Sequence, residues 1–251
     1  MKIPWMLLLL FSSPALARGP ETVEETYAQA EKYLKRGYYV KALEEFQSIR
    51  NHHRDHPLSV EAELAIADVY FEQGEWDLAR MSYNDFQRLH PRHVRLDYAV
   101  YRHGSAALQK ASRIADRDQT WTQQAVNTWS NFSQRFPESA HGEEVEELLL
   151  ESRERLAHKE FRIGRFYYKR EAWGAARGRL EGMVQRYPSS ADLPRALAML
   201  AVSAERMGEI GRAAELGERL VTDHPDAVRA RQHVRRRAPG LLKPPEDTSG
   251  E

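Results

Sequence analysis

The sequence predicts an all-α fold in which five helix pairs stack as a superhelical solenoid. Three observations support this prediction. The 251 residues are rich in strong helix formers, and the alternating β-branched runs typical of strands are rare. A ring-bearing residue followed by proline recurs five times. A small residue precedes most of these prolines at a constant distance, which is the behaviour of an internal repeat.

The first element, residues 1–17, has the composition of a signal peptide. Lys2 supplies the basic start, residues 5–11 are apolar, and Ala15-Leu16-Ala17 resembles a small-residue cleavage site. We expect cleavage after Ala17. An uncleaved membrane anchor or a buried helix are the alternatives, but the apolar run is far shorter than the roughly 20 residues that span a bilayer. No later segment approaches that length, so we expect an exported, soluble chain.

The five ring-proline pairs divide the rest of the chain into units. Proline ends a helix because it lacks an N–H donor and restricts the residue before it. The spacings between these prolines are 34, 46, 51 and 37 residues. One spacing equals the tetratricopeptide period and the others exceed it, which indicates one basic unit with insertions. The pairs are His56-Pro57, His90-Pro91, Phe136-Pro137, Tyr187-Pro188 and His224-Pro225.

The second helix of each predicted pair has a small residue followed by a large one. The small residue lies twelve positions before the proline in four units and should face the partner helix at closest approach: Ala79, Ala125, Ala176 and Ala213. Ala42 takes this place in the first unit, where a polar stretch lengthens the loop. The large residues that follow should fill the space between helices: Phe46, Tyr83, Trp129 and Leu180.

The first helix of each pair ends at a predicted turn. Glycine is suited to such a turn because it adopts a left-handed conformation at little steric cost, and Gly37, Gly74 and Gly208 occupy it in units one, two and five. Glu171 departs from this rule in unit four. A small residue and a tyrosine precede the turn, as with Gly164 and Tyr167. Together these features resemble the tetratricopeptide family over roughly residues 22–227.

Two insertions and a basic end interrupt the array. Residues 112–122 are polar and predict a loop within unit three, whereas residues 142–154 contain enough apolar residues to extend the following helix. After Ala227 the repeat pattern stops. We expect residues 229–251 to form a basic helix end followed by a disordered tail rich in proline, glycine and acidic residues.

Composition argues against several function classes. Lys plus Arg equals Asp plus Glu at 37 each, so no global field favours nucleic acid or an anionic membrane. The chain has no cysteine, which excludes thiol catalysis and disulfides. We find no catalytic motif and expect no cofactor. An enzyme with paired carboxylates in a cleft is an alternative. His52, His53 and His56 lack the spacing of a metal site and are interpreted as a solvated loop.

What remains is a binding surface. The first helices of stacked pairs line a concave face that suits an extended or helical peptide. In units one to three we expect this client groove to be lined by Tyr27, Leu34, Leu64, Asp68, Phe71, Tyr101 and Leu108. The alternative is that individual members pack between neighbouring repeats.

Several stretches resemble the BamD family of outer-membrane assembly factors. The resemblance rests on Asp116-Arg117-Asp118, on residues 132–137 and 155–157, and above all on residues 172–175 and 179–183 followed by Tyr187-Pro188. It implies a non-enzymatic periplasmic protein of five repeats that lies at the inner face of the outer membrane. The N-terminal repeats (residues 18–140) would bind unfolded outer-membrane proteins. The C-terminal repeats (residues 141–228) would dock on the barrel subunit BamA and other subunits of the assembly complex.

The resemblance also implies roles for particular residues. Arg179 matches the family arginine that forms an ion-paired contact with BamA, and Glu181 and Trp173 belong to the same family-like stretch. The alternative for Arg179 is a solvated surface side chain. Members of the family usually have a lipidated cysteine after the signal sequence, where this chain has Arg18. We therefore expect indirect membrane contact through the complex, and a periplasmic adaptor of a cell-division or peptidoglycan complex is the alternative function.

Overall fold

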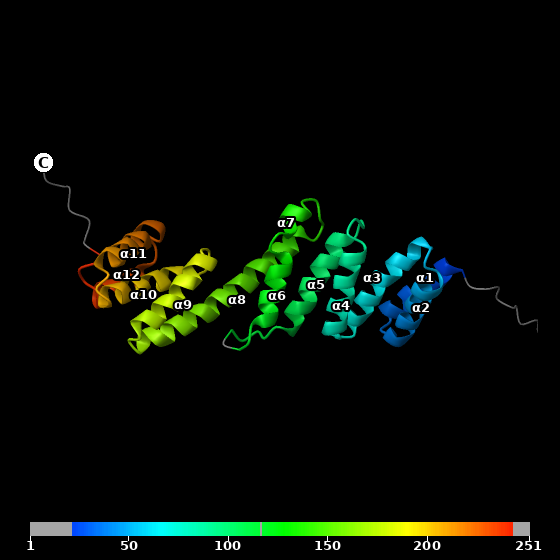
Figure 1. Cartoon of the computed structure of the whole chain (residues 1–251), viewed down its shortest axis with the longest axis horizontal. Helices are drawn as coiled ribbons and strands as arrows, with labels where there is room; N and C mark the ends of the chain where they lie inside the picture. The colour runs from blue at the N-terminus through cyan, green and yellow to red at the C-terminus, as the bar shows by residue number, and fades with distance from the viewer. Residues whose placement is uncertain (1–21, 116, 243–251) are drawn as a thin grey trace, which may run out of the picture. The chain divides into compact units, whose positions relative to one another are not determined.

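The computed structural model describes residues 22–115 and 117–242. The predicted signal peptide, Arg18, Asp116 and the end of the tail lie outside these residues. Within them the chain forms twelve helices (Figure 1): α1 (Val23–Lys35), α2 (Tyr39–His52), α3 (Pro57–Glu72), α4 (Trp76–Leu89), α5 (Leu96–Lys110), α6 (Thr120–Trp129), α7 (Phe132–Arg135), α8 (Gly142–Lys169), α9 (Trp173–Arg186), α10 (Leu193–Arg206), α11 (Ile210–Asp223) and α12 (Val228–Arg237).

The described residues divide into two compact units, which meet in sequence between residues 73 and 74. Four of the five predicted helix pairs each pack within one unit: α1 with α2, α5 with α6, α8 with α9, and α10 with α11. The helices of the second predicted pair, α3 and α4, follow one another in the chain and belong to different units. In the first unit α2 packs on both α1 and α3, and in the second each pair packs on the next along the chain. Contact between sequence neighbours is the arrangement of a repeat protein. The predicted all-α class of tetratricopeptide-like pairs is confirmed.

The unit boundary differs from the boundary predicted between the two working halves. The contacts divide at residues 73 and 74, in the turn between α3 and α4, rather than at residue 140. The long helix α8 begins at Gly142 and packs on α6 as well as on α9, so it joins the third pair to the fourth. The predicted assignment of client binding and docking to the two halves stays a prediction.

One small residue in the first helix of each pair shares a register. It lies seven positions before the turn residue in every pair and is buried in each case: Ala30, Ala67, Gly104, Gly164 and Ala201. In the second helix the predicted small residues have no exposed surface: Ala42, Ala79, Ala125, Ala176 and Ala213. Small side chains on both partners let the two backbones approach closely. The burial expected of these alanines is therefore confirmed.

The large residues of the second helices fill the space that the small ones leave. Phe46, Tyr83, Trp129 and Leu180 are all fully buried. A Cβ atom added at Gly104 would overlap the Trp129 ring, and one added at Gly164 would lie 2.6 Å from Leu180 Cγ. In these two pairs the large side chain lies directly against the backbone of the first helix.

The turns within the pairs confirm the glycine prediction. Gly37, Gly74 and Gly208 have φ angles of 75°, 78° and 80°. Glu171, which breaks the glycine rule, adopts the same left-handed conformation with φ of 60°, so the turn geometry is kept without its preferred residue. In the third pair Ala111 is extended instead, with ψ of 139°, and leads into the inserted loop.

The second helix ends two positions before the proline in the second, fourth and fifth units, as predicted. In the first unit it ends earlier, at His52. In the third unit α6 ends at Trp129, and the short helix α7 ends two positions before Pro137. Pro57 then starts α3 as its first residue, where a missing N–H donor costs nothing.

The second insertion takes the predicted form, and the first does so in part, because α6 already begins at Thr120 within the predicted loop of residues 112–122. Residues 111–115 and 117–119 lie outside the helices, and the buried Gln119 holds this loop because its amide donates hydrogen bonds to the carbonyls of Ser112 (3.1 Å) and Ile114 (2.8 Å). Its side-chain oxygen accepts a hydrogen bond from Thr122. The second insertion extends α8 to 28 residues, about 42 Å.

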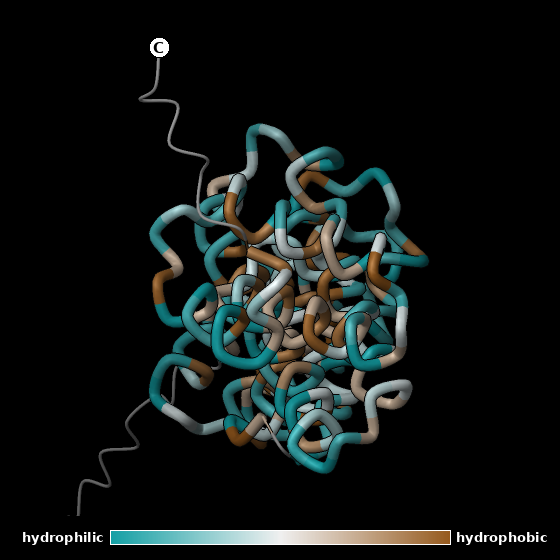
Figure 2. Tube along the Cα trace, turned by 90° about the vertical axis from the view of Figure 1, so that its left-hand side faces the viewer, coloured by the Kyte–Doolittle hydropathy of each residue, from teal (hydrophilic) through white to brown (hydrophobic). Residues whose placement is uncertain are grey.

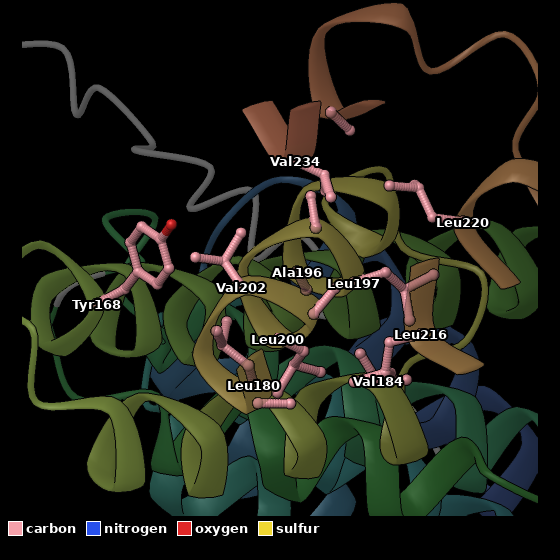
Figure 3. Packing of buried hydrophobic residues seen from close by; sticks show 14 of the residues in the cluster. Tyr168, Leu180, Val184, Ala196, Leu197, Leu200, Val202, Leu216, Leu220 and Val234 are labelled. Carbon is pink, nitrogen blue, oxygen red and sulfur yellow. The ribbon is translucent and has the colours of Figure 1, made fainter. Parts of the chain in front are cut away.

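The C-terminal core corrects one prediction. Residues 229–242 are not a basic helix end followed by a tail that packs nowhere, because α11 ends at Asp223 and α12 is a separate helix. Its Ala230 and Val234 are buried on α10, and Ala238 continues this apolar stripe at a spacing of four residues. Figure 3 shows Val234 in the cluster that also contains Leu180, Leu197 and Leu200.

Apolar residues alternate with polar ones along the helices (Figure 2). Among residues 22–115 and 117–242, no helix is both long and apolar enough to cross a bilayer.

Candidate docking surface

The candidate docking surface is built on α8 and α9 around Arg179. Arg179 projects from the exposed side of α9 with half of its side chain accessible, and its Nη1 donates to Glu160 Oε2 of α8 at 3.4 Å. The same oxygen lies 3.8 Å from Nη2 of Arg186, which is seven residues, or about two turns, beyond Arg179 on α9. Glu160 is mostly buried, so its carboxylate orients the two exposed guanidinium groups from below.

Glycine residues, which have no side chain, flank Arg179 on α9. Gly174, Gly178 and Gly182 recur at every fourth residue of α9, and an added Cβ would meet nothing within 4 Å at the first two. Gly178, Gly182, Arg179 and Arg186 line a hollow of about 440 Å³ with Tyr167 and Glu160. A partner element can approach the α9 backbone closely here because no side chain separates them.

The charges of this surface favour a carboxylate on the partner. Two arginines share one carboxylate, which leaves one net positive charge. The Arg179–Glu160 contact is long and uses one N–H group, so most of the five donors of the guanidinium stay available. A fixed guanidinium fork can bind a partner carboxylate with two parallel hydrogen bonds.

The structure does not place Glu181 and Trp173 on this surface. Glu181 is two residues beyond Arg179, about 200° around α9, and is half-buried. Trp173 lies edge-on to the Tyr168 ring with 5.4 Å between centroids, and lines a different hollow of about 200 Å³ with Arg206 and Arg237. The predicted trio is not one contact surface, and the docking role of each residue stays a prediction.

Five predicted groove residues belong to the first unit. Tyr27 and Leu34 of α1 are half-buried against its core, and the Tyr27 ring meets Phe46 edge-on at 5.3 Å. Asp68 and Phe71 of α3 are also half-buried. Leu64 corrects the prediction because it has no exposed surface, so it is a packing residue that a client cannot reach. Its place on a helix with apolar residues on nearly every side explains this burial.

The other two groove residues belong to the second unit. The Tyr101 hydroxyl donates to Glu144 at 2.7 Å, and its ring stacks on His141 with 4.7 Å between centroids. Burial, followed by the hydrogen bond to Glu144, raises the pKa of Tyr101 above its usual value. Leu108 is half-buried against the core of the third pair. Both side chains already hold their own unit together, and each keeps an exposed edge.

The histidine-rich loop has structural partners. His56 caps α3 by accepting the Leu58 N–H at Nδ1, and its Nε2 lies 3.1 Å from Glu24. His52 Nδ1 lies 3.0 Å from the Ser48 carbonyl. Within the described residues, no group of three or more His, Cys, Asp or Glu side chains could hold a metal ion.

Sequence reasoning missed Glu160 and Arg186. Glu160 lies 19 residues before Arg179 on the preceding helix, and its pairing depends on how α8 and α9 pack. The glycines at every fourth residue of α9 were a signal of an open helix face that the sequence did carry.

The fold defines a helical-repeat protein of the tetratricopeptide type, and the surface around Arg179 is its candidate docking face. The model of one family, YfiO, described as an outer membrane lipoprotein, matches residues 20–220. The chain belongs to this family. Its description names a lipoprotein, whereas the 251 residues contain no cysteine.

The chain is also similar to proteins named outer membrane protein assembly factor BamD. It is 25% identical over 213 residues to the one of Neisseria meningitidis, covering 81% of this chain and 80% of that protein. It is 27% identical over 216 residues to the one of Xylella fastidiosa, with coverage of 81% and 73%. The Vibrio cholerae protein is 22% identical over 193 residues, with coverage of 73% and 80%.

Among solved structures, a TPR2AB-domain complex of yeast Sti1 is similar at a TM-score of 0.42 and 16% identity, covering 84% of this chain and 81% of that one.

Proposed function

We propose that the protein is a non-enzymatic subunit of an outer-membrane β-barrel assembly complex. In this proposal it binds unfolded outer-membrane proteins and docks on a BamA-type insertase in the periplasm, at the inner face of the outer membrane. The observation that carries the proposal is the family match over residues 20–220. It is supported by relatives named as assembly factors, which the chain matches over most of their length.

The docking step is assigned to Arg179. Its guanidinium is half exposed, held at one N–H by Glu160, and flanked by bare glycine backbone that a partner can approach. A carboxylate of the insertase would bind the free donors as a bidentate pair. Removing one partner of such a charged pair typically costs 2–5 kcal/mol, which is a loss of at least about 30-fold in affinity.

The docking assignment is tested by pull-down of the insertase from solubilised membranes. We expect Arg179→Leu to lose most of the recovered insertase, and Arg179→Lys to restore only part of it because lysine lacks the planar fork. Arg212→Leu is the matched control, since Arg212 is equally exposed on α11 and away from this surface. Unchanged recovery with Arg179→Leu, in a variant with wild-type circular dichroism, would contradict the assignment.

The client step is assigned to the accessible groove residues. A photo-crosslinking side chain at Phe71 or Tyr101 should capture an unfolded outer-membrane protein, whereas one at Met81, which is 63% exposed on α4, should not. Equal capture at all three positions would contradict a defined client groove.

The alternative function is an adaptor of a cell-division or peptidoglycan-related complex. The observation that favours it is the absence of cysteine from a sequence whose family is described as a lipoprotein. Affinity purification separates the two functions: recovery of cell-wall synthesis proteins without the insertase would favour the adaptor.

A further inference from the structure

Helix α12 presents a strongly cationic face. Residues 227–242 contain five arginines and no carboxylate: Arg229, Arg231, Arg235, Arg236 and Arg237. Ala230 and Val234 pack against α10, which turns the opposite side of α12 toward solvent. Arg229 and Arg236 are seven residues apart and share that side, with Arg235 beside them. All three are exposed.

These three arginines differ from three exposed arginines nearby in the sequence, each of which is ion-paired. Arg212 pairs with Glu215 at 2.9 Å, Arg219 with Asp223 at 3.3 Å, and Arg195 with Asp192 at 2.7 Å. Within the part of the chain that the structure describes, no ion pair joins Arg229, Arg235 or Arg236 to a carboxylate. Their guanidinium donors therefore point into solvent and attract anions.

A small hollow adjoins this face between α10 and α12. It measures about 430 Å³ and is lined by Arg195, Ala198, Met199, Arg229, Ala230 and His233. Arg195 and Arg229 place two guanidinium groups at its wall, while the alanine and methionine side chains form an apolar part. The hollow is large enough for a phosphate with its attached carbon groups. It is too small to hold a partner helix, whose diameter is about 10–12 Å.

We propose that the solvent face of α12 binds the headgroups of anionic phospholipids at a membrane surface, with one phosphate held in the hollow beside Arg229. Guanidinium groups bind phosphate oxygens with two parallel hydrogen bonds. A cluster of several arginines at an anionic bilayer is the usual composition of a polybasic lipid-binding segment.

The mode of binding follows from the packing of α12. Its apolar residues are used in the core, so the helix cannot insert into the bilayer and contacts it by charge alone. Binding should therefore be reversible and sensitive to salt. A phospholipid surface fits these observations better than an acidic peptide, because the three arginines lie on a convex helix face with room for many separate phosphates.

Cosedimentation of the purified protein with vesicles tests the proposal. We expect binding to vesicles of phosphatidylcholine mixed with phosphatidylglycerol at low salt, loss of binding at high salt, and no binding to phosphatidylcholine alone. The variant Arg229→Gln/Arg235→Gln/Arg236→Gln should bind at least about tenfold more weakly, since each arginine near the surface contributes severalfold. Glutamine has nearly the same helix propensity as arginine, so α12 should stay folded.

The control variant is Arg88→Gln/Arg212→Gln/Arg219→Gln, which removes the same charge from other exposed positions and should bind normally. Of the single variants, Arg229→Gln should lose more binding than Arg235→Gln, because only Arg229 lines the hollow. Equal losses would overturn the assignment of the hollow.

Three outcomes overturn the proposal itself: no binding of the wild type to anionic vesicles, equal losses in the two triple variants, or tighter binding of a polyglutamate peptide than of vesicles. The last outcome would assign the face to an acidic protein segment. The experiment contains only protein and lipid, so its failure leaves the proposed assembly function untouched, and failure of that function leaves the lipid face untouched.

Discussion

The two units contain the same kind of helix pair, but they differ in how closely a large side chain of the second helix packs against the backbone of the first. In the first unit the buried small residue of the first helix is Ala30, which shares its cluster with Phe46. In the second unit the same register holds Gly104 and Gly164, where a Cβ would overlap Trp129 or lie 2.6 Å from Leu180. The pairs at Gly104 and Gly164 thus have lower helix propensity but closer packing of large side chains against backbone, whereas the α10–α11 pair of the same unit keeps an alanine, Ala201, at this register. The repeat signature specifies a pair, and the residue at one register decides how deep its large side chain lies.

The largest expected effect comes from removing a large side chain of the second unit. Trp129→Ala should lower the free energy of unfolding by about 3–5 kcal/mol, because it leaves a cavity against Gly104 and removes the indole hydrogen bond to the Tyr101 carbonyl. Denaturant unfolding measures this change. Ile210→Ala is the control, since Ile210 is 59% exposed on α11 and should cost little. Similar losses in both variants would mean that Trp129 is not a packing centre.

The next effect tests the glycine register directly. Gly164→Ala should destabilise the protein by about 1–3 kcal/mol because the new methyl group displaces Leu180. Gly178→Ala on the open face of α9 should stabilise it by roughly 0.5–1 kcal/mol, since alanine is the better helix former and meets nothing within 4 Å. The two substitutions are chemically identical and differ in sign. A stabilising Gly164→Ala would refute the close-packing argument.

Acid should destabilise the second unit through His103 of α5. Burial, followed by the charge of Arg80, lowers the pKa of His103 from 6.5 to about 4. The unfolded chain therefore binds more protons between these values, and stability falls as the pH drops through this window. Between pH 7 and pH 5 the loss from this group is about 1–2 kcal/mol.

Thermal unfolding of His103→Gln measures this contribution. From pH 7 to pH 5, the melting temperature of the variant should fall less than that of the wild type. His53→Gln, in the exposed loop of the first unit, is the control and should titrate like the wild type. Parallel curves for all three proteins would contradict the role of His103.

The smallest effect concerns the start of the first unit. Thr22 Oγ1 accepts the Glu25 N–H at 3.2 Å, and Glu25 accepts the Thr22 N–H at 3.0 Å, which forms a capping box at the start of α1. Thr22→Ala should cost about 1 kcal/mol, whereas Thr22→Ser keeps the cap and should cost much less. Hydrogen exchange of the α1 amides measures the change. Equal protection in both variants would show that tertiary packing, rather than the cap, holds α1.

Much of the fold could be predicted because its signals are local. Proline after a ring residue ends a helix by its own chemistry, and Gly37, Gly74 and Gly208 mark left-handed turns. Ala176 and Leu180 were assigned correctly from spacing alone. The candidate surface was harder to predict. Arg179 was found by resemblance, but its partners Glu160 and Arg186 were not, because their meeting depends on the packing of two helices.

Three features escaped the sequence for the same reason. Leu64 was expected in an open groove and is fully buried. The arginine-rich segment was expected to be the end of the last repeat helix, yet it forms a separate helix that Val234 and Ala238 anchor to the core. Glu181 and Trp173 adjoin Arg179 in sequence but lie elsewhere around α9. In each case a residue type was recognised, while the side of the helix that a neighbour covers was not.

The sequence by itself determined the class of fold, the number of helix pairs, the positions of their turns and the identity of the buried alanines. These follow from backbone chemistry and from periodicity, which act within a few residues. The tertiary structure decided where the chain divides into units, how deep Trp129 and Leu180 lie, and which charged side chains meet. Those outcomes depend on how closely two packed helices approach each other, and one methyl group at Gly104 or Gly164 is enough to change that distance.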